Sequence, residues 1–370
     1  MRDQDFQPDV VTFNSAISAC KTGEQWETAI RIFSEVREQE LAHSVVSYNS
    51  VMTSCEKGKH WERSLELVRD MREQDLEATR ITFIAAMSTC ANCFFWKRSA
   101  GILTEMQNQG LESDVISCSA AISACSRSEL WGRAADVLAN MQERALEPNT
   151  ISYSGAISAC EQGQQWARSF GILADLCEQG LRPDVISCSA AITACEKGEQ
   201  WEQALVMLGA MQERRIEPNR ISFNAAVSAC EKCEKWEQAL WLLDKMRVES
   251  LQADVISYSA AISACEKGDQ WVMALRVWVD MQEQKLEPNE ISFNAAISAC
   301  GKGGHWEQAL AMLEVMQAQA REPDVISYSA AISACEKGGQ WEHALTLFSG
   351  MRQQELLPDV ITCSAAISAC

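Results

Sequence analysis

The sequence has few of the residues from which most enzyme active sites and membrane spans are built. Its 370 residues include four histidines. None of these stands in a pattern with serine or cysteine that would suggest a nucleophile and its base. No apolar run reaches the roughly 18 residues that a membrane-spanning helix needs. We therefore expect no enzyme activity, no cofactor, no metal and no membrane partner.

Positive charge is also scarce. The chain has 32 lysines and arginines against 51 aspartates and glutamates, a net charge of −19. A protein this acidic is not drawn to nucleic acid or to anionic lipid by its overall field. Any nucleic-acid function must therefore use a local stripe of basic residues. The N-terminal stretch MRDQDFQPDV has neither the apolar core of a signal peptide nor the Arg- and Ser-rich composition of a transit peptide.

What the sequence does have is a strict internal repeat of 35 residues. A fixed period in this range is typical of a solenoid or propeller built from one supersecondary unit. Full units begin at residues 10, 45, 80, 115, 150, 185, 220, 255, 290 and 325, which makes ten. The markers of the period are Trp26, Trp61, Trp96, Trp131, Trp166, Trp201, Trp236, Trp271, Trp306 and Trp341, with Cys20, Cys55, Cys90, Cys125, Cys160, Cys195, Cys230, Cys265, Cys300, Cys335 and Cys370.

This register divides the chain into three parts. Residues 1–9, MRDQDFQPD, align with MRQQELLPD at 351–359 and form the tail of an earlier unit. Residues 10–359 hold the ten full units, and residues 360–370 begin an eleventh. Because the chain starts and stops inside a unit without capping repeats, we expect a fragment, or a product that starts at an internal methionine.

Each unit is expected to hold two helices. In residues 201–211 the apolar positions recur at i, i+3, i+4, i+6, i+7 and i+10, which favours an amphipathic helix. In residues 325–335, VISYSAAISAC, Tyr328 and Ile332 fall at helical spacing and Asp324 is a suitable N-cap, although the β-branched start also suits a strand. The fold prediction is an all-α solenoid of about ten helix–turn–helix repeats, with an α/β horseshoe as the alternative.

The seventeen cysteines raise the question of disulfides or metal sites. Neighbouring helices pack about 10 Å apart, whereas a disulfide needs Cα atoms within about 7 Å. We therefore expect the eleven repeated cysteines to be small buried thiols. Cys118, Cys188 and Cys363 stand where other units have Tyr or Phe, which also indicates packing. Reduced cysteines in this number indicate a reducing compartment.

Two C-x-x-C pairs, Cys90–Cys93 and Cys230–Cys233, could belong to a metal site. His60 and Glu62 precede the first pair and give H-x-E followed by C-x-x-C, which is similar to a zinc cytidine deaminase signature. However, these two residues flank a repeat tryptophan, and Thr89 stands where the signature has proline. We expect packing, with an RNA-editing enzyme as the alternative that the zinc content of the protein would decide.

Function is expected where polar positions change in a patterned way between units. From the fourth unit on, the fifth position holds Ser or Asn and the last holds Asp or Asn. Capping is the simplest explanation, but it accepts Asp and Asn alike and leaves the restricted pairing unexplained. The fifth positions are Asn14, Asn49, Ile84, Ser119, Ser154, Ser189, Asn224, Ser259, Asn294 and Ser329, and the last are Ser44, Thr79, Asp114, Asn149, Asp184, Asn219, Asp254, Asn289, Asp324 and Asp359.

At this point a family resemblance can be stated. The 35-residue unit with VISFNAAISAC, a methionine near the end of its second helix (Met211, Met281, Met351) and a closing EPN or LPD resembles the pentatricopeptide repeat family, in its plain 35-residue class. The resemblance implies a right-handed superhelix that binds single-stranded RNA, one base per repeat. It also implies a chloroplast or mitochondrial role in RNA processing, stability, editing or translation, with room for protein partners. A tetratricopeptide-like protein scaffold, which repeats at 34 residues, is the competing hypothesis.

The resemblance implies that the fifth and last positions read the bases. Aspartate accepts hydrogen bonds and suits the imino N–H of G or U, whereas Asn or Ser donates to a ring acceptor of A or C. Serine at the fifth position leaves room for a purine, and asparagine suits a pyrimidine. Units four to ten then predict A-G-A-U-A-U-G, 5′ to 3′. The first unit suggests C, the second is ambiguous, and the third, with Ile84, should discriminate poorly.

Two further columns are implied to contact RNA. The second position is aliphatic, and the family uses it to sandwich bases, with ordinary core packing as the alternative: Ile116, Ile151, Ile186, Ile221, Ile256, Ile291 and Ile326. A basic residue recurs near the end of the first helix, where it can follow a phosphate backbone or complement the helix C-terminus: Lys57, Arg127, Lys197, Lys232, Lys267, Lys302 and Lys337.

Overall fold

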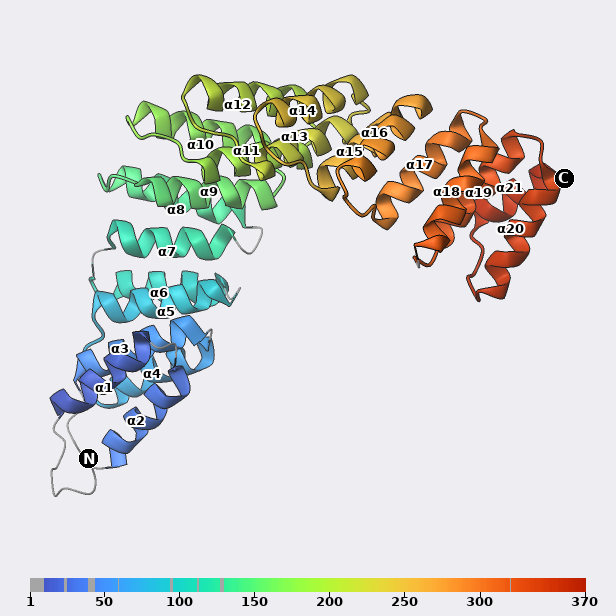
Figure 1. Cartoon of the computed structure of the whole chain (residues 1–370). Coiled ribbons are helices and arrows are strands. Elements are labelled where there is room, and N and C mark those ends of the chain that lie inside the picture. Colours follow the sequence, from blue (N-terminus) through green and yellow to red (C-terminus); the bar gives the residue numbers. More distant parts are fainter. Residues whose placement is uncertain are drawn as a thin grey trace. The chain divides into compact units, whose positions relative to one another are not determined.

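The computed structural model describes residues 10–22, 25–38, 44–58, 60–93, 96–111, 113–126, 130–319 and 321–370. These residues form 21 helices and no strand (Figure 1), so the all-α prediction is confirmed and the α/β horseshoe is wrong. The predicted tail at 1–9 lies outside them. The helices are α1 Val10–Thr22, α2 Trp26–Glu38, α3 Val45–Gly58, α4 Trp61–Glu73, α5 Arg80–Asn92, α6 Trp96–Asn108, α7 Val115–Ser126, α8 Trp131–Glu143, α9 Thr150–Gln162, α10 Trp166–Glu178, α11 Val185–Lys197, α12 Trp201–Glu213, α13 Arg220–Lys232, α14 Trp236–Val248, α15 Val255–Lys267, α16 Trp271–Glu283, α17 Glu290–Lys302, α18 Trp306–Ala318, α19 Val325–Lys337, α20 Trp341–Gln353 and α21 Val360–Ala369.

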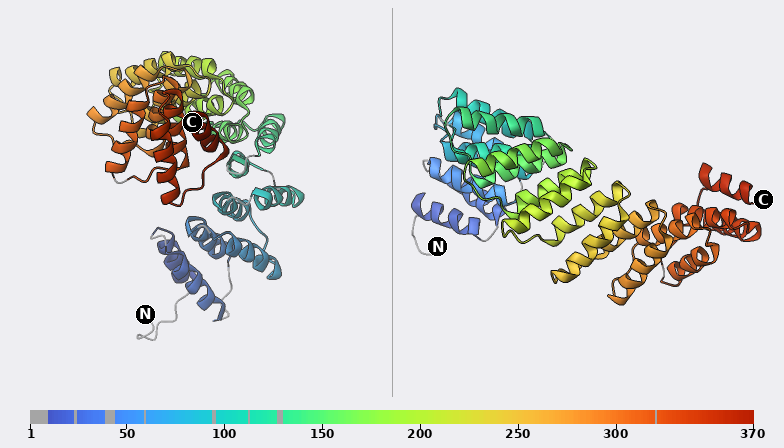
Figure 2. Two further views of the ribbon diagram at one scale, coloured as in Figure 1. Left: turned by 90° about the vertical axis from the view of Figure 1, so that its right-hand side faces the viewer. Right: turned by 90° about the horizontal axis from the view of Figure 1, so that it is seen from above.

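The chain forms two compact units, Met1–Ala194 and Cys195–Cys370. In the first unit α5 packs against its partner α6 and against α7, the first helix of the next repeat; α7 packs in the same way against α8 and α9. In the second unit α15 packs against α16 and α17, and α17 against α18 and α19. Within each unit the odd-numbered helices therefore stack on one another as one layer, and the even-numbered helices form a second (Figure 2). Each unit is an α-solenoid of helix–turn–helix repeats.

Both turns of a repeat close in the same way. At the end of α15 the backbone N–H of Gln270 donates to the carbonyl of Cys265 at 2.8 Å, and Asp269 between them is left-handed, with φ 56°. At the end of α16, Met281 accepts in the same way and Lys285 is the left-handed residue. This is the Schellman arrangement, which satisfies carbonyls that a helix end leaves without partners. The repeated cysteine and methionine thus stand at equivalent places in the two helices.

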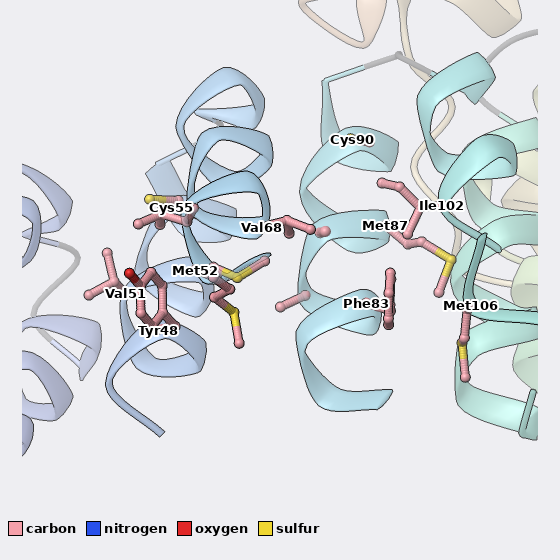
Figure 3. Packing of buried hydrophobic residues seen from close by; sticks show 14 of the residues in the cluster. Tyr48, Val51, Met52, Cys55, Val68, Phe83, Met87, Cys90, Ile102 and Met106 are labelled. Atoms are coloured by element: carbon pink, nitrogen blue, oxygen red, sulfur yellow. The ribbon is translucent and has the colours of Figure 1, made fainter. Parts of the chain in front are cut away.

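The core lies between the two helix layers. In the first unit, Tyr48 and Cys55 of α3 and Phe83 and Cys90 of α5 repeat the same packing one unit apart (Figure 3), and all four are fully buried. Met106 of α6 closes the layer against Phe83. Burying an aromatic or aliphatic side chain stabilises the fold by roughly 1.5–3 kcal/mol. The stability of the core is therefore the sum of many contributions of similar size along the chain.

The repeated cysteines are free thiols and most of them pack in this core; Cys20 is only partly buried, and the prediction of burial is wrong for Cys370, which is exposed at the end of α21. Nine of them, from Cys55 to Cys335, are buried, and burial raises the pKa of the Cys195 and Cys265 thiols to about 12. The His60 ring lies 3.6 Å from the Trp26 ring, centroid to centroid, so it packs against aromatic surface. Within the described residues no group of three His, Cys, Asp or Glu side chains could hold a metal ion. Nor is any helix in the described part of the chain long and apolar enough to cross a membrane.

The repeated tryptophan opens every second helix, and in five repeats it lies against the glycine at the end of the next repeat's first helix, which is Gly58, Gly163, Gly268, Gly303 or Gly338. A Cβ placed on Gly303 would stand 2.6 Å from Cδ1 of Trp271, and the same distance separates a Cβ on Gly58 from Trp26. Carbon atoms do not approach this closely, so a side chain at these glycines forces the indole to shift. The tryptophan and glycine therefore fix how successive repeats meet.

We expect Gly303→Ala to destabilise the protein by about 1–2 kcal/mol, because the added methyl overpacks this contact. The cost stays moderate because Cys233 carries a side chain at the equivalent position. The matched control is Gly209→Ala inside α12, where nothing lies within 4 Å and where the change should stabilise by about 0.5–1 kcal/mol. Urea unfolding of both variants gives the comparison, and equal stabilisation by the two changes would contradict the packing role.

Candidate nucleic-acid interface

The second position of each repeat forms an exposed aliphatic column. Its side chains are between 59% and 68% exposed, although the next two residues along each helix are largely buried. Ordinary core packing is therefore wrong for this position. One such side chain per repeat gives a row of evenly spaced apolar surfaces against which flat aromatic rings can pack. The members are Val46, Ile81, Ile116, Ile151, Ile186, Ile221, Ile256, Ile291, Ile326 and Ile361.

Three positions further along, in five repeats, the fifth-position side chain forms a hydrogen bond with the last-position side chain of the same repeat. Asn224 Nδ2 donates to Asp254 Oδ1 at 3.0 Å, and Ser259 Oγ donates to Asn289 Oδ1 at 3.0 Å. The structure thus brings together residues that are 30 positions apart in the sequence. Hydrogen bonds of 3.0–3.4 Å join the predicted pairs Asn49/Thr79, Ser154/Asp184, Asn224/Asp254, Ser259/Asn289 and Asn294/Asp324.

The last-position residue is also the N-cap of the next repeat's first helix. Asn149 Oδ1 accepts the backbone N–H of Ser152 at 2.9 Å, and Asp254 Oδ1 accepts that of Ser257 at 3.0 Å. The same bond is made by Asp114, Asp184, Asn219, Asn289, Asp324 and Asp359. Such a cap stabilises a helix by about 1 kcal/mol. Capping is therefore a real part of the pattern.

Capping also decides which atom each of these residues leaves for a ligand. An amide accepts hydrogen bonds through its oxygen alone. When Asn149 caps with Oδ1, its Nδ2 group is left as a donor. When Asp254 caps with Oδ1, its second oxygen, Oδ2, is left as an acceptor. Asp and Asn are thus equal as caps but opposite as hydrogen-bonding partners, so capping and the restricted pairing are compatible.

In five of these sites a hydroxyl at the third position of the next repeat also forms a hydrogen bond with the fifth-position side chain. Ser257 Oγ donates to Asn224 Oδ1 at 2.5 Å, and Ser327 Oγ donates to Asn294 Oδ1 at the same distance. This bond holds the fifth-position amide so that its nitrogen faces the last-position carboxylate. Sequence reasoning missed these serines because they look like ordinary capping-box residues. The available signal was that the third position of each unit is always Ser or Thr.

Two described aspartates of this network, Asp254 and Asp359, have a carboxyl pKa below the usual value. At Asp254, burial opposes ionisation, but hydrogen bonds from Ser257 and Asn224 and the charge of Arg220 together lower the carboxyl pKa. At Asp359, hydrogen bonds from the Thr362 side chain and backbone lower the pKa. Both groups are therefore carboxylates at neutral pH and can accept hydrogen bonds but not donate them.

Two repeats add an arginine to the last-position aspartate. In the third unit Ile84 offers no hydrogen bond, and Arg80 Nε instead lies 3.3 Å from Asp114 Oδ2. In the seventh unit Arg220 Nε lies 3.2 Å from Asp254 Oδ2. These arginines could not be singled out by sequence reasoning, because their partners stand 34 residues further along the chain.

Three lysines of the basic column are paired with glutamates of the preceding repeat, so lysines and glutamates alternate along the column. Lys232, Lys267 and Lys302 form ion pairs at 2.9–3.1 Å with Glu196, Glu231 and Glu266, which lie one repeat earlier. Sequence reasoning missed these glutamates, although each directly precedes a lysine in the motif CEK. The lysine side chains are 36–38% exposed, whereas their glutamate partners are 16–24% exposed, so the lysine is the more accessible member of each pair. Of the remaining predicted site residues, Arg127 and the Asn14 side chain lie outside the described part of the chain.

The fold and the two columns of side chains define the class: this is a helical-repeat protein. Comparisons with known proteins identify the family. The model of the pentatricopeptide repeat domain matches residues 1–58, 101–162, 171–232 and 241–303. The PPR repeat family model matches 288–337 and 323–370, and the PPR repeat model matches 46–76 and 221–251. The chain belongs to the pentatricopeptide repeat family. No curated protein sequence matches the chain.

Solved structures share the fold. The pentatricopeptide repeat protein PPR10 in complex with an 18-nt psaJ RNA element matches with a TM-score of 0.66 at 18% identity, over 97% of this chain and 57% of that chain. PPR10 from maize matches with a TM-score of 0.56 at 19% identity, over 100% of this chain and 62% of that one. The chain thus spans less than two thirds of these structures, and at this identity the match shows the fold alone.

We expect Ile256→Ser to leave the free energy of unfolding within about 0.5 kcal/mol of wild type, because a side chain that is 59% exposed contributes little to the core. The matched control is Ile262→Ala on the same helix, which removes a fully buried side chain and should cost about 2–5 kcal/mol. Both values come from urea unfolding. A large loss of unfolding free energy in Ile256→Ser would show that the second position is a core position and would contradict this description.

Proposed function

We propose that the chain binds single-stranded RNA sequence-specifically, with one base per repeat. One observation carries this proposal. In successive repeats an exposed aliphatic side chain lies on the same helix as a fifth-position residue that is hydrogen-bonded to the last position. A base held between the second-position side chains of consecutive repeats, such as Ile221 and Ile256, has its hydrogen-bonding edge near the polar pair between them. The PPR10 complex with an RNA element supports the same use of this fold.

The predicted order of bases follows from the pairs. Units four to ten carry Ser119/Asn149, Ser154/Asp184, Ser189/Asn219, Asn224/Asp254, Ser259/Asn289, Asn294/Asp324 and Ser329/Asp359. The atoms that capping leaves free support the assignment, because Asn presents a donor for A or C and Asp an acceptor for G or U. The proposed target is A-G-A-U-A-U-G. The lysines of the basic column exchange their glutamates for phosphates as the RNA binds.

The proposal includes a role in organellar RNA processing, stability, editing or translation, in a chloroplast or mitochondrion, as the family resemblance implies. It assigns the chain no catalytic step of its own, so a change to a bound transcript would come from protein partners or from the exclusion of other proteins. A buried core of reduced thiols is compatible with such a compartment.

The direct test is fluorescence anisotropy with labelled RNA that contains AGAUAUG, with a scrambled RNA and with the matching DNA. We expect tight binding to the first and weaker binding to the other two, with affinity that falls as salt rises. Equal or absent binding to all three would refute base reading and favour the protein-binding scaffold.

The variant Asn149→Asp gives a sharper prediction. Aspartate caps a helix as well as asparagine does, so the free energy of unfolding should stay within about 0.5 kcal/mol of wild type. The exchange of a donor for an acceptor should shift the preference at the first base from A to G by about tenfold, which corresponds to one hydrogen bond. Binding is compared on AGAUAUG and GGAUAUG. A variant that weakens binding to both RNAs equally would show that Asn149 does not read a base.

A further inference from the structure

The first position of the repeat differs in charge between units. Most units have valine or threonine there, but the third and seventh have Arg80 and Arg220, and the ninth has Glu290. Each of these charged residues precedes the last-position aspartate of its own repeat by 34 residues. The family pattern used above for base reading does not include this position.

Arg220 contacts the oxygen that Asp254 leaves available for a base. Asp254 Oδ1 already accepts from the Ser257 backbone N–H and from Asn224 Nδ2, each at 3.0 Å. Oδ2 takes the ion pair with Arg220 Nε at 3.2 Å. A carboxylate oxygen has two lone pairs, so one position on Oδ2 remains for the imino N–H of a base. The arginine side chain is 59% exposed, which places its charge at the surface where RNA would lie.

The seventh and ninth repeats form a natural matched pair. Both carry asparagine at the fifth position and aspartate at the last, joined at 3.0 Å in Asn224/Asp254 and 3.3 Å in Asn294/Asp324. Both are predicted to read U. Their reading groups are thus the same, whereas the first position carries a positive charge in one repeat and an exposed negative charge, Glu290, in the other.

We propose that the first position is an electrostatic positioning site that sets how strongly a repeat with a last-position aspartate binds its base. Arg220 holds the Asp254 carboxylate and offsets its repulsion of the RNA phosphates, whereas Glu290 adds to the repulsion at Asp324. The seventh repeat therefore binds its uridine more tightly than the ninth. Arg80 acts in the same way on Asp114 of the third repeat, where Ile84 gives no hydrogen bond. This inference rests on the proposed function.

The test compares Arg220→Val and Glu290→Val by anisotropy on AGAUAUG RNA. Valine is the matched replacement because the neighbouring repeats carry it at this position, as Val255 and Val325. We expect Arg220→Val to weaken binding about threefold and Glu290→Val to tighten it by a similar factor, the size of one exposed charge interaction. Both differences should shrink when ionic strength rises from about 50 mM to about 300 mM, because salt screens exposed charges.

The salt series separates this role from a structural one, because a loosened fold would weaken binding at every ionic strength. The inference is overturned if Arg220→Val tightens binding, which would show that the arginine blocks the base, or if either variant binds like wild type. In those cases the wild-type preference for AGAUAUG over scrambled RNA would still stand. If wild type shows no such preference, the proposed function fails and this inference fails with it.

Discussion

The hydrogen bond between the last-position side chain and the backbone N–H at the start of the next repeat is the interaction on which the site depends. It joins the end of one repeat to the first helix of the next, as in Asp254 with Ser257. A side-chain oxygen must be used for it, so the chemical identity of the other terminal atom decides what faces outward. A local rule of helix capping thus becomes a choice between donor and acceptor at each repeat. The fold and the proposed recognition are linked through this one atom pair.

The solenoid gives this interaction a constant setting. Within each compact unit the Schellman turns close the repeats in the same way, and in five repeats a Trp–Gly contact fixes how the next first helix meets the repeat before it. Three consecutive residues of that helix then have different surroundings: Ile256 is exposed, whereas Ser257 and Tyr258 are buried. The exposed residue costs stability relative to burial. Its recurrence is the reason why we propose that RNA covers this column.

Much of this architecture could be predicted from the sequence because it depends on local rules. The 35-residue period, the glycines and the spacing of Tyr328 and Ile332 predicted paired helices, and nine of the eleven repeated cysteines are buried as predicted. The fifth and last positions were identified from their restricted alternation, and the structure brings them together. Residues 30 apart meet only through the packing of one first helix on the next, so their hydrogen bonds could be inferred from the family but not from the residues themselves.

Other parts of the site could not be predicted, for the same physical reason. The exposure of Ile256 distinguishes it from a core residue only after the helix is placed, since a valine or isoleucine in a helical pattern fits either environment. The Glu231–Lys267 pairs and the Arg220–Asp254 contact join residues 34 or 36 apart, at distances that sequence spacing does not give. These contacts show that the charged residues of the site balance one another before any ligand binds.

The most direct measurement is the structure of the chain in complex with AGAUAUG RNA. The account predicts that each base lies between the second-position side chains of consecutive repeats, with its Watson–Crick edge on the pair between them. For the seventh repeat this places the uridine between Ile221 and Ile256, with its N3–H on Asp254 Oδ2. RNA bound along the even-numbered helices, or bases turned away from the last-position side chains, would contradict the account.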